Sequence, residues 1–357
     1  MKILHIAPFN VAGVPLTFVK AEQAMGHDSR LITLAKNLRS YPEDICLNLP
    51  FLYFKGFATI KKMVIDKSRT QITNIKPILD EIPPTWRPGK IESLLIHFRE
   101  KTWGQKIGKA FQRYKIDQFD VIQLDGGIGF YRDGRDIKRL QKNGKKIICC
   151  YTGSDLRTRG VIPQIDEIAD VNVSVEFDHL PLHPNLHHIF FPFDAKKIKS
   201  VKMRENSILL IGHAPTNRAA KGSDVIIPVV KQLEEKYPVK LVLIENLPYE
   251  QALEQKSKCH IFIDQIGDLG YGINSLESLA MGIPTCSCLA DGFEEKYPDH
   301  PFIVIQESNL KQRLTCLIND KSLRFNKGRK GRDWVLKHHD PVNVVRKIHQ
   351  IAQLDTK

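Results

Sequence analysis

A short stretch in the second half of the chain combines glycines, polar side chains and one carboxylate. Residues 259–265 read as a buried strand, and a glycine-flanked turn then leads into a predicted short helix. Ligands of open α/β sheets bind at the carboxyl ends of strands, and phosphates favour helix N-termini. We expect ribose hydroxyls to bind Glu277, for which a plain solvent-facing carboxylate is the alternative. The predicted ligand-binding residues are Gly270, Tyr271, Gly272, Ile273, Asn274 and Glu277.

A second stretch, upstream of the first, carries two cations in a loop between a strand and a helix. The apolar run 208–212 predicts the strand, and the helix is predicted from Ser223. Between them lie Arg218 and Lys221, whose forked donors and point charge together suit a diphosphate. A solvated charged loop is the alternative. His213, beside this loop, is the histidine that we expect nearest to a ligand.

Weaker candidates lie in the first half of the chain. Gly13 follows the first predicted strand, and its missing side chain lets backbone amides approach phosphates. Asp155 follows another predicted strand, where it could hold an acceptor or sugar hydroxyl, or cap the next helix. Arg157 and Arg159 could bind an anionic acceptor or pair with Asp155.

Strand-like runs that alternate with helical runs predict parallel sheets and an α/β fold. The last strand of the first half is predicted at residues 188–192. The charged run 195–205 lacks a clear period, and a fresh series of strands and helices begins at Ser207. Asp340 is predicted to cap a C-terminal helix. We therefore predict two domains and a final helix, at residues 1–195, 206–340 and 341–357.

In this order and at these spacings, the segments resemble the family-4 glycosyltransferases of the GT-B class, the group 1 type. Members place an Arg/Lys pair after the first strand of their C-terminal half and a glutamate-containing helix opposite it. Residues 152–155 are similar to their His-Gly-x-Asp signature. The resemblance covers nearly the whole chain. It implies two Rossmann-like domains facing across a cleft, with the nucleotide sugar in the C-terminal domain and a last helix that crosses back.

The activity implied by the resemblance is that of a hexosyltransferase-like enzyme. It would move a sugar from a nucleoside-diphosphate sugar to a glycan, lipid-linked or other hydroxyl acceptor, with retention of the anomeric configuration. The expected catalytic residues are Arg218 and Lys221, which would stabilise the leaving diphosphate, and Asp155. We expect no cofactor and no metal, because side-chain cations can serve the diphosphate and no Asp-x-Asp motif stands in the right context.

Two departures from the family pattern affect the prediction. Many relatives carry a glutamate eight residues before the second one, where this chain has Leu269 beside Asp268. The histidine of the family signature is Thr152 here. Either the sugar is held differently, or Asp268 replaces the glutamate, or the chain is a catalytically weakened binding subunit. A nucleotide-sugar epimerase is a further alternative, although it would need more clustered carboxylates than Glu277 alone.

Charge is distributed unevenly along this chain, whose net charge is +13. Cations dominate residues 55–115, where apolar and aromatic residues interleave with them. Such a surface can lie on anionic lipid headgroups, whereas a solvated helix face is the alternative. A nucleic-acid partner is not expected, because no nucleic-acid-binding module is recognisable.

The apolar runs and the cysteines bear on localisation. No apolar run reaches the roughly 20 residues of a membrane helix, and no secretory signal is recognisable. Most of the seven cysteines lie in strand-like runs, as buried thiols do in a reducing compartment. We expect a cytoplasmic protein that can attach peripherally to the inner membrane face.

Overall fold

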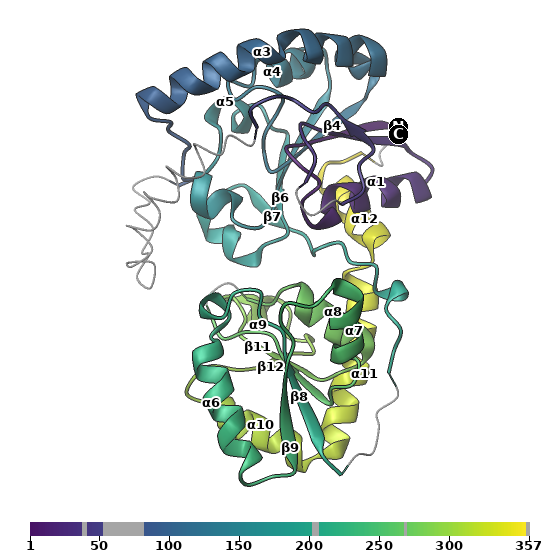
Figure 1. The fold of residues 1–357 in the computed structure, drawn as a ribbon. Coiled ribbons are helices and arrows are strands. Elements are labelled where there is room, and N and C mark those ends of the chain that lie inside the picture. Colours follow the sequence, from purple (N-terminus) through teal and green to yellow (C-terminus); the bar gives the residue numbers. More distant parts are fainter. Residues whose placement is uncertain (38–40, 53–81, 202–206, 268–269, 355–357) are drawn as a thin grey trace. The chain divides into compact units, whose positions relative to one another are not determined.

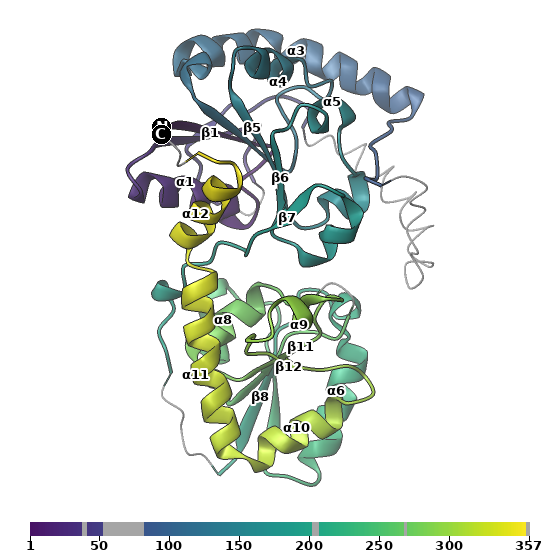
Figure 2. The same cartoon turned by 180° about the vertical axis from the view of Figure 1, so that it is seen from behind.

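The structure, a computed structural model, describes residues 1–37, 41–52, 82–201, 207–267 and 270–354. The chain divides into two compact units, one formed by Met1–Phe191 with Val344–Lys357 and the other by Pro192–Asn343. Each unit holds one parallel sheet with helices on both faces (Figures 1 and 2). The predicted α/β class is therefore confirmed. None of the helices within the described residues is long and apolar enough to cross a bilayer.

The first unit is built on a seven-stranded sheet in the order β3-β2-β1-β4-β5-β6-β7. All pairings are parallel. The strand order changes direction between β1 and β4, and open α/β sheets bind ligands at such a point. The strands are β1 (Lys2–Ala7), β2 (Asp28–Thr33), β3 (Ile45–Cys46), β4 (Val121–Asp125), β5 (Lys146–Tyr151), β6 (Val171–Ser174) and β7 (Leu186–His188).

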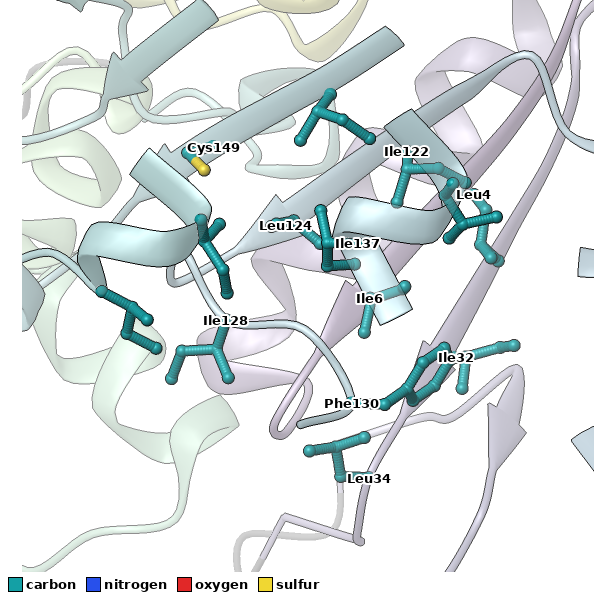
Figure 3. Packing of buried hydrophobic residues seen from close by; sticks show 14 of the residues in the cluster. Leu4, Ile6, Ile32, Leu34, Ile122, Leu124, Ile128, Phe130, Ile137 and Cys149 are labelled. Atoms are coloured by element: carbon teal, nitrogen blue, oxygen red, sulfur yellow. The ribbon is translucent and has the colours of Figure 1, made fainter. Parts of the chain in front are cut away.

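Helices cover both faces of this sheet, α3, α4 and α5 on one and α1 and α12 on the other (Figures 1 and 2). Figure 3 shows Ile137 of α4 packed beside Ile6 and Leu124 of the central strands, all fully buried. Each such side chain stabilises the fold by about 1.5–3 kcal/mol. The described helices and short turns are η1 (Val11–Gly13), α1 (Val14–Ala24), α3 (Lys90–Tyr114), η3 (Ile116–Gln118), α4 (Arg135–Lys142), η4 (Asp155–Arg159), α5 (Pro163–Asp166), η5 (Phe177–Leu182) and α12 (Pro341–Ile351).

The last strand of the first unit differs from the prediction. The expected strand at residues 188–192 is wrong, because β7 covers Leu186–His188. Its neighbour β6 ends at Ser174, which pairs with His188. Beyond that pair the Ile189 amide still donates to the Ser174 carbonyl, at 2.9 Å. An apolar run becomes a strand only as far as a neighbouring strand supplies hydrogen-bond partners.

The second unit holds a five-stranded parallel sheet in the order β12-β11-β10-β8-β9. Here the order changes direction between β8 and β10. The strands are β8 (Leu209–His213), β9 (Val239–Leu243), β10 (Ile261–Ile263), β11 (Thr285–Ser287) and β12 (Ile303–Val304).

Helices α6 and α10 pack on one face of this second sheet, and α8 and α11 on the other (Figures 1 and 2). Asp340 caps α12 as predicted, since its Oδ1 accepts the amides of Val342 and Asn343 at 3.0 and 3.3 Å. The described helices and turns of the unit are η6 (Ala195–Lys197), η7 (Ala219–Lys221), α6 (Ser223–Glu234), α7 (Tyr249–Lys256), α8 (Ile273–Met281), α9 (Phe293–Lys296), α10 (Leu310–Asn319) and α11 (Lys321–His338).

Candidate functional site

The loop after β8 and the N-terminus of α8 meet at the carboxyl edge of the second sheet, where the strand order changes direction. The Asn274 side chain donates to the carbonyl of Ala214 at 2.8 Å. Lys221 Nζ donates to Asp264 Oδ1 at 2.7 Å, and Asp264 Oδ2 accepts the Gly272 amide at 2.8 Å. The structure therefore brings together the two segments that the sequence singled out, with Asp264 between them.

Asp264 organises this edge and was not among the predicted site residues. Its carboxylate is 1% exposed and also accepts the Ser275 hydroxyl at 2.7 Å. Burial raises the pKa of Asp264, but Lys221, Ser275 and the Gly272 amide outweigh burial and lower it. The charged Asp264 thus lies against the N-terminus of α8, where anions are favoured. An aspartate directly after a buried strand and before a glycine turn is the sequence signal that could have identified it.

Both predicted phosphate-binding cations already have carboxylate partners. Arg218 donates through Nε and Nη2 to the two oxygens of Glu245, at 2.8 and 2.7 Å, and its side chain is 58% exposed. The Lys221 side chain is only 16% exposed beside the buried Asp264. An incoming diphosphate would have to displace Glu245 from Arg218, whereas it would find Lys221 already held in place.

Glu277 lies deeper than a ribose-binding carboxylate was expected to lie. The residue is 4% exposed and its Oε2 accepts a hydrogen bond from the ammonium group of Lys256, which is 1% exposed. Lys256 also donates to Asn274 Oδ1 at 2.8 Å and stands 4.9 Å from the centre of the Phe262 ring. Glu277 and Asn274 therefore form one buried polar network with a lysine that the sequence did not single out.

The remaining residues of the glycine turn differ in their packing and in their exposure to solvent. Gly270 adopts a left-handed conformation with φ at +80°, and a Cβ there would lie 3.3 Å from the Ala290 amide nitrogen. The Tyr271 ring packs 4.5 Å from the Phe302 ring, and its hydroxyl lies 3.3 Å from His339 Nε2. Ile273 is 38% exposed. Asp268 and Leu269, at which the family pattern is broken, lie outside the described residues.

His213 is placed inside the second unit and makes hydrogen bonds only within it, as far as the described chain shows. Its Nδ1 donates to the Ile263 carbonyl at 2.9 Å, and its Nε2 accepts the Ser223 hydroxyl at 2.8 Å. Burial lowers the pKa of His213, which favours this neutral form. The residue thus fixes the start of α6 relative to β10 and has no ring nitrogen left for a ligand.

The other predicted residues belong to the first unit. Gly13 precedes α1 with φ at +73°, a conformation that suits glycine. Asp155 Oδ2 accepts the amide and the hydroxyl of Thr152, at 3.0 and 3.4 Å, so the residue that replaces the family histidine holds Asp155. Burial raises the pKa of Asp155, although Arg159 acts in the opposite direction. Within the described residues no group of three His, Cys, Asp or Glu side chains could hold a metal ion.

Comparison with known proteins identifies the fold. The sequence matches no family model and no curated protein sequence. Sucrose-phosphate synthase from Thermosynechococcus elongatus is similar over 99% of this chain and 98% of its own, with 12% identity and a TM-score of 0.61. The N-terminal domain of Candida albicans trehalose-6-phosphate phosphatase is similar over 99% of this chain and 97% of its own, with 13% identity and a TM-score of 0.62. TarM is similar over 99% of both chains, with 10% identity and a TM-score of 0.56.

At these identities the likeness concerns the fold alone. The chain has the GT-B architecture, in which two Rossmann-like α/β domains each carry a parallel sheet. The predicted GT-B fold is confirmed.

Proposed function

We propose that this protein is a glycosyltransferase of the family-4 type, which moves a sugar from a nucleoside-diphosphate sugar to a hydroxyl acceptor. The observation that carries the proposal is the meeting of the Arg218 and Lys221 loop with the N-terminus of α8 at the edge of the second sheet. An arginine that is 58% exposed and a lysine held in place beside a helix N-terminus suit a diphosphate, once Glu245 has left Arg218. The GT-B fold supports the same assignment.

The proposed chemistry needs no covalent enzyme intermediate and no metal ion or other cofactor. The acceptor oxygen bonds to the anomeric carbon on the face from which the diphosphate leaves, and the acceptor proton passes to the leaving phosphate oxygen. Arg218 and Lys221 stabilise the charge that develops on the diphosphate. The ribose is held by Glu277 and Asn274, whose hydrogen bonds with Lys256 have to rearrange for it, and Asp155 holds the acceptor or the donor sugar. The acceptor is a glycan or a lipid-linked or other hydroxyl compound.

The proposal as a whole is tested by measuring the thermal unfolding of the protein with and without each member of a panel of nucleoside diphosphates and their sugars. A ligand that binds only the folded state raises the free energy of unfolding by about 2.7 kcal/mol at a hundredfold excess over its Kd. We expect one base to stabilise the protein more than the others. No stabilisation by any member of the panel would contradict the proposed function.

Arg218→Ala is expected to weaken nucleoside-diphosphate binding roughly tenfold or more, because it removes a forked cation from the phosphate site. Glu245→Gln is expected to tighten binding, since Arg218 would no longer have to leave a carboxylate. Calorimetric titration measures both effects. Lys231→Ala is the matched control, since this cation is 59% exposed and pairs with Glu234 on α6. Unchanged affinity in Arg218→Ala would contradict the assignment.

Lys221→Ala is expected to weaken the same binding and also to destabilise the second unit. The variant leaves the buried carboxylate of Asp264 without its cation, which is costly in a low-dielectric interior. Denaturation and calorimetric titration separate the two effects. A variant with unchanged stability and unchanged affinity would contradict both roles.

For the partner surface we propose contact with an anionic membrane, through helix α3 of the first unit. Four large apolar residues of α3 are exposed, at positions i, i+3, i+4 and i+7: Ile91 by 77%, Leu94 by 64%, Leu95 by 42% and Phe98 by 69%. The exposed cations of the helix are Lys90, Lys101, Lys106, Lys109 and Arg113, against one exposed acid, Glu92. An apolar stripe among cations is what the anionic cytoplasmic leaflet attracts. Residues 55–81 of the predicted basic segment lie outside the described residues.

Co-sedimentation with vesicles is expected to show binding to anionic but not to neutral lipid. Binding should weaken steeply with salt, because screening shortens to about 3 Å at 1 M. Leu94→Ser with Phe98→Ser should reduce it, whereas Leu247→Ser, an exposed apolar residue of the second unit, should not. Equal and negligible binding to both vesicle types would mean that α3 is a solvated face and would favour a soluble acceptor.

A further inference from the structure

Three arginine side chains of the first unit gather where strands β4 and β5 end. Arg132 lies in the loop after β4, Arg159 ends η4 after β5, and Arg99 comes from α3. The Arg159 guanidinium donates to the carbonyl of Gly126, the first residue after β4. Arg159 and Arg99 are both near enough to Arg132 to lower its pKa. This edge of the sheet is where open α/β folds bind ligands.

The hydrogen-bond donors of this cluster are not fully used. Arg132 Nη1 and Arg99 Nε are buried and have no hydrogen-bond partner within the described chain. Among the described residues, Arg159 donates only to backbone carbonyls, those of Gly160 and Gly126. Buried polar groups in native proteins nearly always have partners, and exceptions can mark an absent ion.

Carboxylates compensate the cluster only in part. In the described part of the structure, neither Arg132 nor Arg159 has a carboxylate oxygen within 4.0 Å. Glu100 lies 3.8 Å from Arg99, and it accepts the Arg132 amide at 2.8 Å. Asp155 accepts hydrogen bonds from Thr152. Burial, aided by the two neighbouring cations, lowers the pKa of Arg132 to about 9, which reflects an environment unfavourable to its charge.

A purely structural role accounts for only part of this arrangement. The Arg132 guanidinium lies 5.9 Å from the centre of the Trp86 ring, a cation–π contact that would also occur on an ordinary surface. That contact does not explain why two more arginines are held beside Arg132, one of which, Arg159, has no carboxylate oxygen within 4.0 Å among the described residues. Groups kept in an unfavourable electrostatic environment are typical of functional sites.

We propose that Arg132, Arg159 and Arg99 form an oxyanion-binding site on the first unit, which takes the phosphate or carboxylate group of a ligand. A planar guanidinium matches either group through two parallel hydrogen bonds. The binding itself is independent of the function proposed above. The ligand's identity rests on that function: if the protein is a glycosyltransferase, the anion belongs to the acceptor, which is then a phosphorylated or acidic compound.

Titration with inorganic phosphate at constant ionic strength tests the site. The titration uses the full chain with Arg218→Ala, which disables the candidate diphosphate site of the second unit. We expect Arg132→Met and Arg159→Met in this background each to weaken phosphate binding roughly tenfold or more. Arg139→Met should leave it unchanged, since Arg139 stacks on Phe111 and pairs with Asp117. Parallel titrations with glycerol 3-phosphate and acetate distinguish a phosphate ester from a carboxylate.

Stability without ligand provides an independent readout. Because it removes an unpaired, half-buried charge, Arg132→Met should be at least as stable as its parent while it binds phosphate more weakly. Phosphate affinity that is the same in both variants and the parent would overturn the proposal, as would the absence of phosphate binding in the Arg218→Ala background. If the unsubstituted protein binds no nucleoside diphosphate while phosphate binding depends on Arg132 and Arg159 as expected, only the proposed function is contradicted.

Discussion

Replacing Glu22 by glutamine should lower the free energy of unfolding by about 3–5 kcal/mol, because it breaks a buried ion pair from one side. His5 of β1 is fully buried between two carboxylates, with Nε2 2.9 Å from Glu22 and Nδ1 3.0 Å from Asp125. Glu22 also accepts the Ser29 hydroxyl and lies 3.4 Å from His349 Nε2 on α12. The variant leaves the imidazolium with one carboxylate. Chemical denaturation at neutral pH measures the loss.

The pH dependence of stability gives the same network a second signature. Burial alone would lower the pKa of His5, but Glu22 and Asp125 outweigh burial and raise it to about 10. The resulting stabilisation is complete below the unfolded pKa of 6.5 and is lost as the pH rises towards 10. Burial alone would raise the pKa of Glu22, but His5 and His349 help to lower it to about 2. That contribution is present above pH 4.5 and is lost as the pH falls towards 2.

Glu22→Gln should therefore make the free energy of unfolding depend less on pH, both in the acid range below pH 4.5 and in the alkaline range above pH 6.5. Glu167→Gln is the matched control, because Glu167 is an exposed carboxylate of the same unit. Its effect should stay within about 0.5 kcal/mol. If the Glu22→Gln protein had unchanged stability and an unchanged pH dependence of stability, a stabilising ion pair between His5 and Glu22 would be contradicted.

Lys256→Met should cost about 3–5 kcal/mol as well, because it leaves the carboxylate of Glu277 buried without a cation. Adding Glu277→Gln to this variant should recover most of the loss, since no uncompensated charge then remains. The double-mutant cycle, measured by denaturation, yields the coupling between the two side chains.

Lys258→Met is the control for that cycle. Lys258 lies two residues further along the chain, its side chain is 41% exposed, and it pairs with the exposed Glu254. Its replacement should change stability by less than about 0.5 kcal/mol. A Lys256→Met protein as stable as the control, or a double variant no more stable than Lys256→Met, would contradict the buried ion pair.

The sequence by itself was sufficient to predict most elements of the fold, because their signals are local. The apolar runs 208–212 and 259–265 predicted β8 and β10, and Asp340 predicted the start of α12. The length of a strand is not local. The strand expected at residues 188–192 became β7 at Leu186–His188, because its neighbour ends at Ser174.

Local signals also selected the two segments that meet at the edge of the second sheet. A strand, a loop with Arg218 and Lys221, and a glycine turn before Glu277 were recognisable from residue types and spacing. The carboxyl ends of parallel strands lie at one edge, so that their loops come near each other once the strand order is known. The sequence therefore predicted which segments form the candidate site.

Only the tertiary structure decided which charge each of these residues faces. Glu245 is 27 positions from Arg218, Asp264 is 43 from Lys221, and Lys256 is 21 from Glu277. Asp125 is 120 positions from His5. Such partners are chosen by strand order, by register and by the direction in which each side chain points. Burial then decides how strongly the paired charges interact. A linear pattern of residue types contains neither the identity of each charge partner nor the burial of the pair.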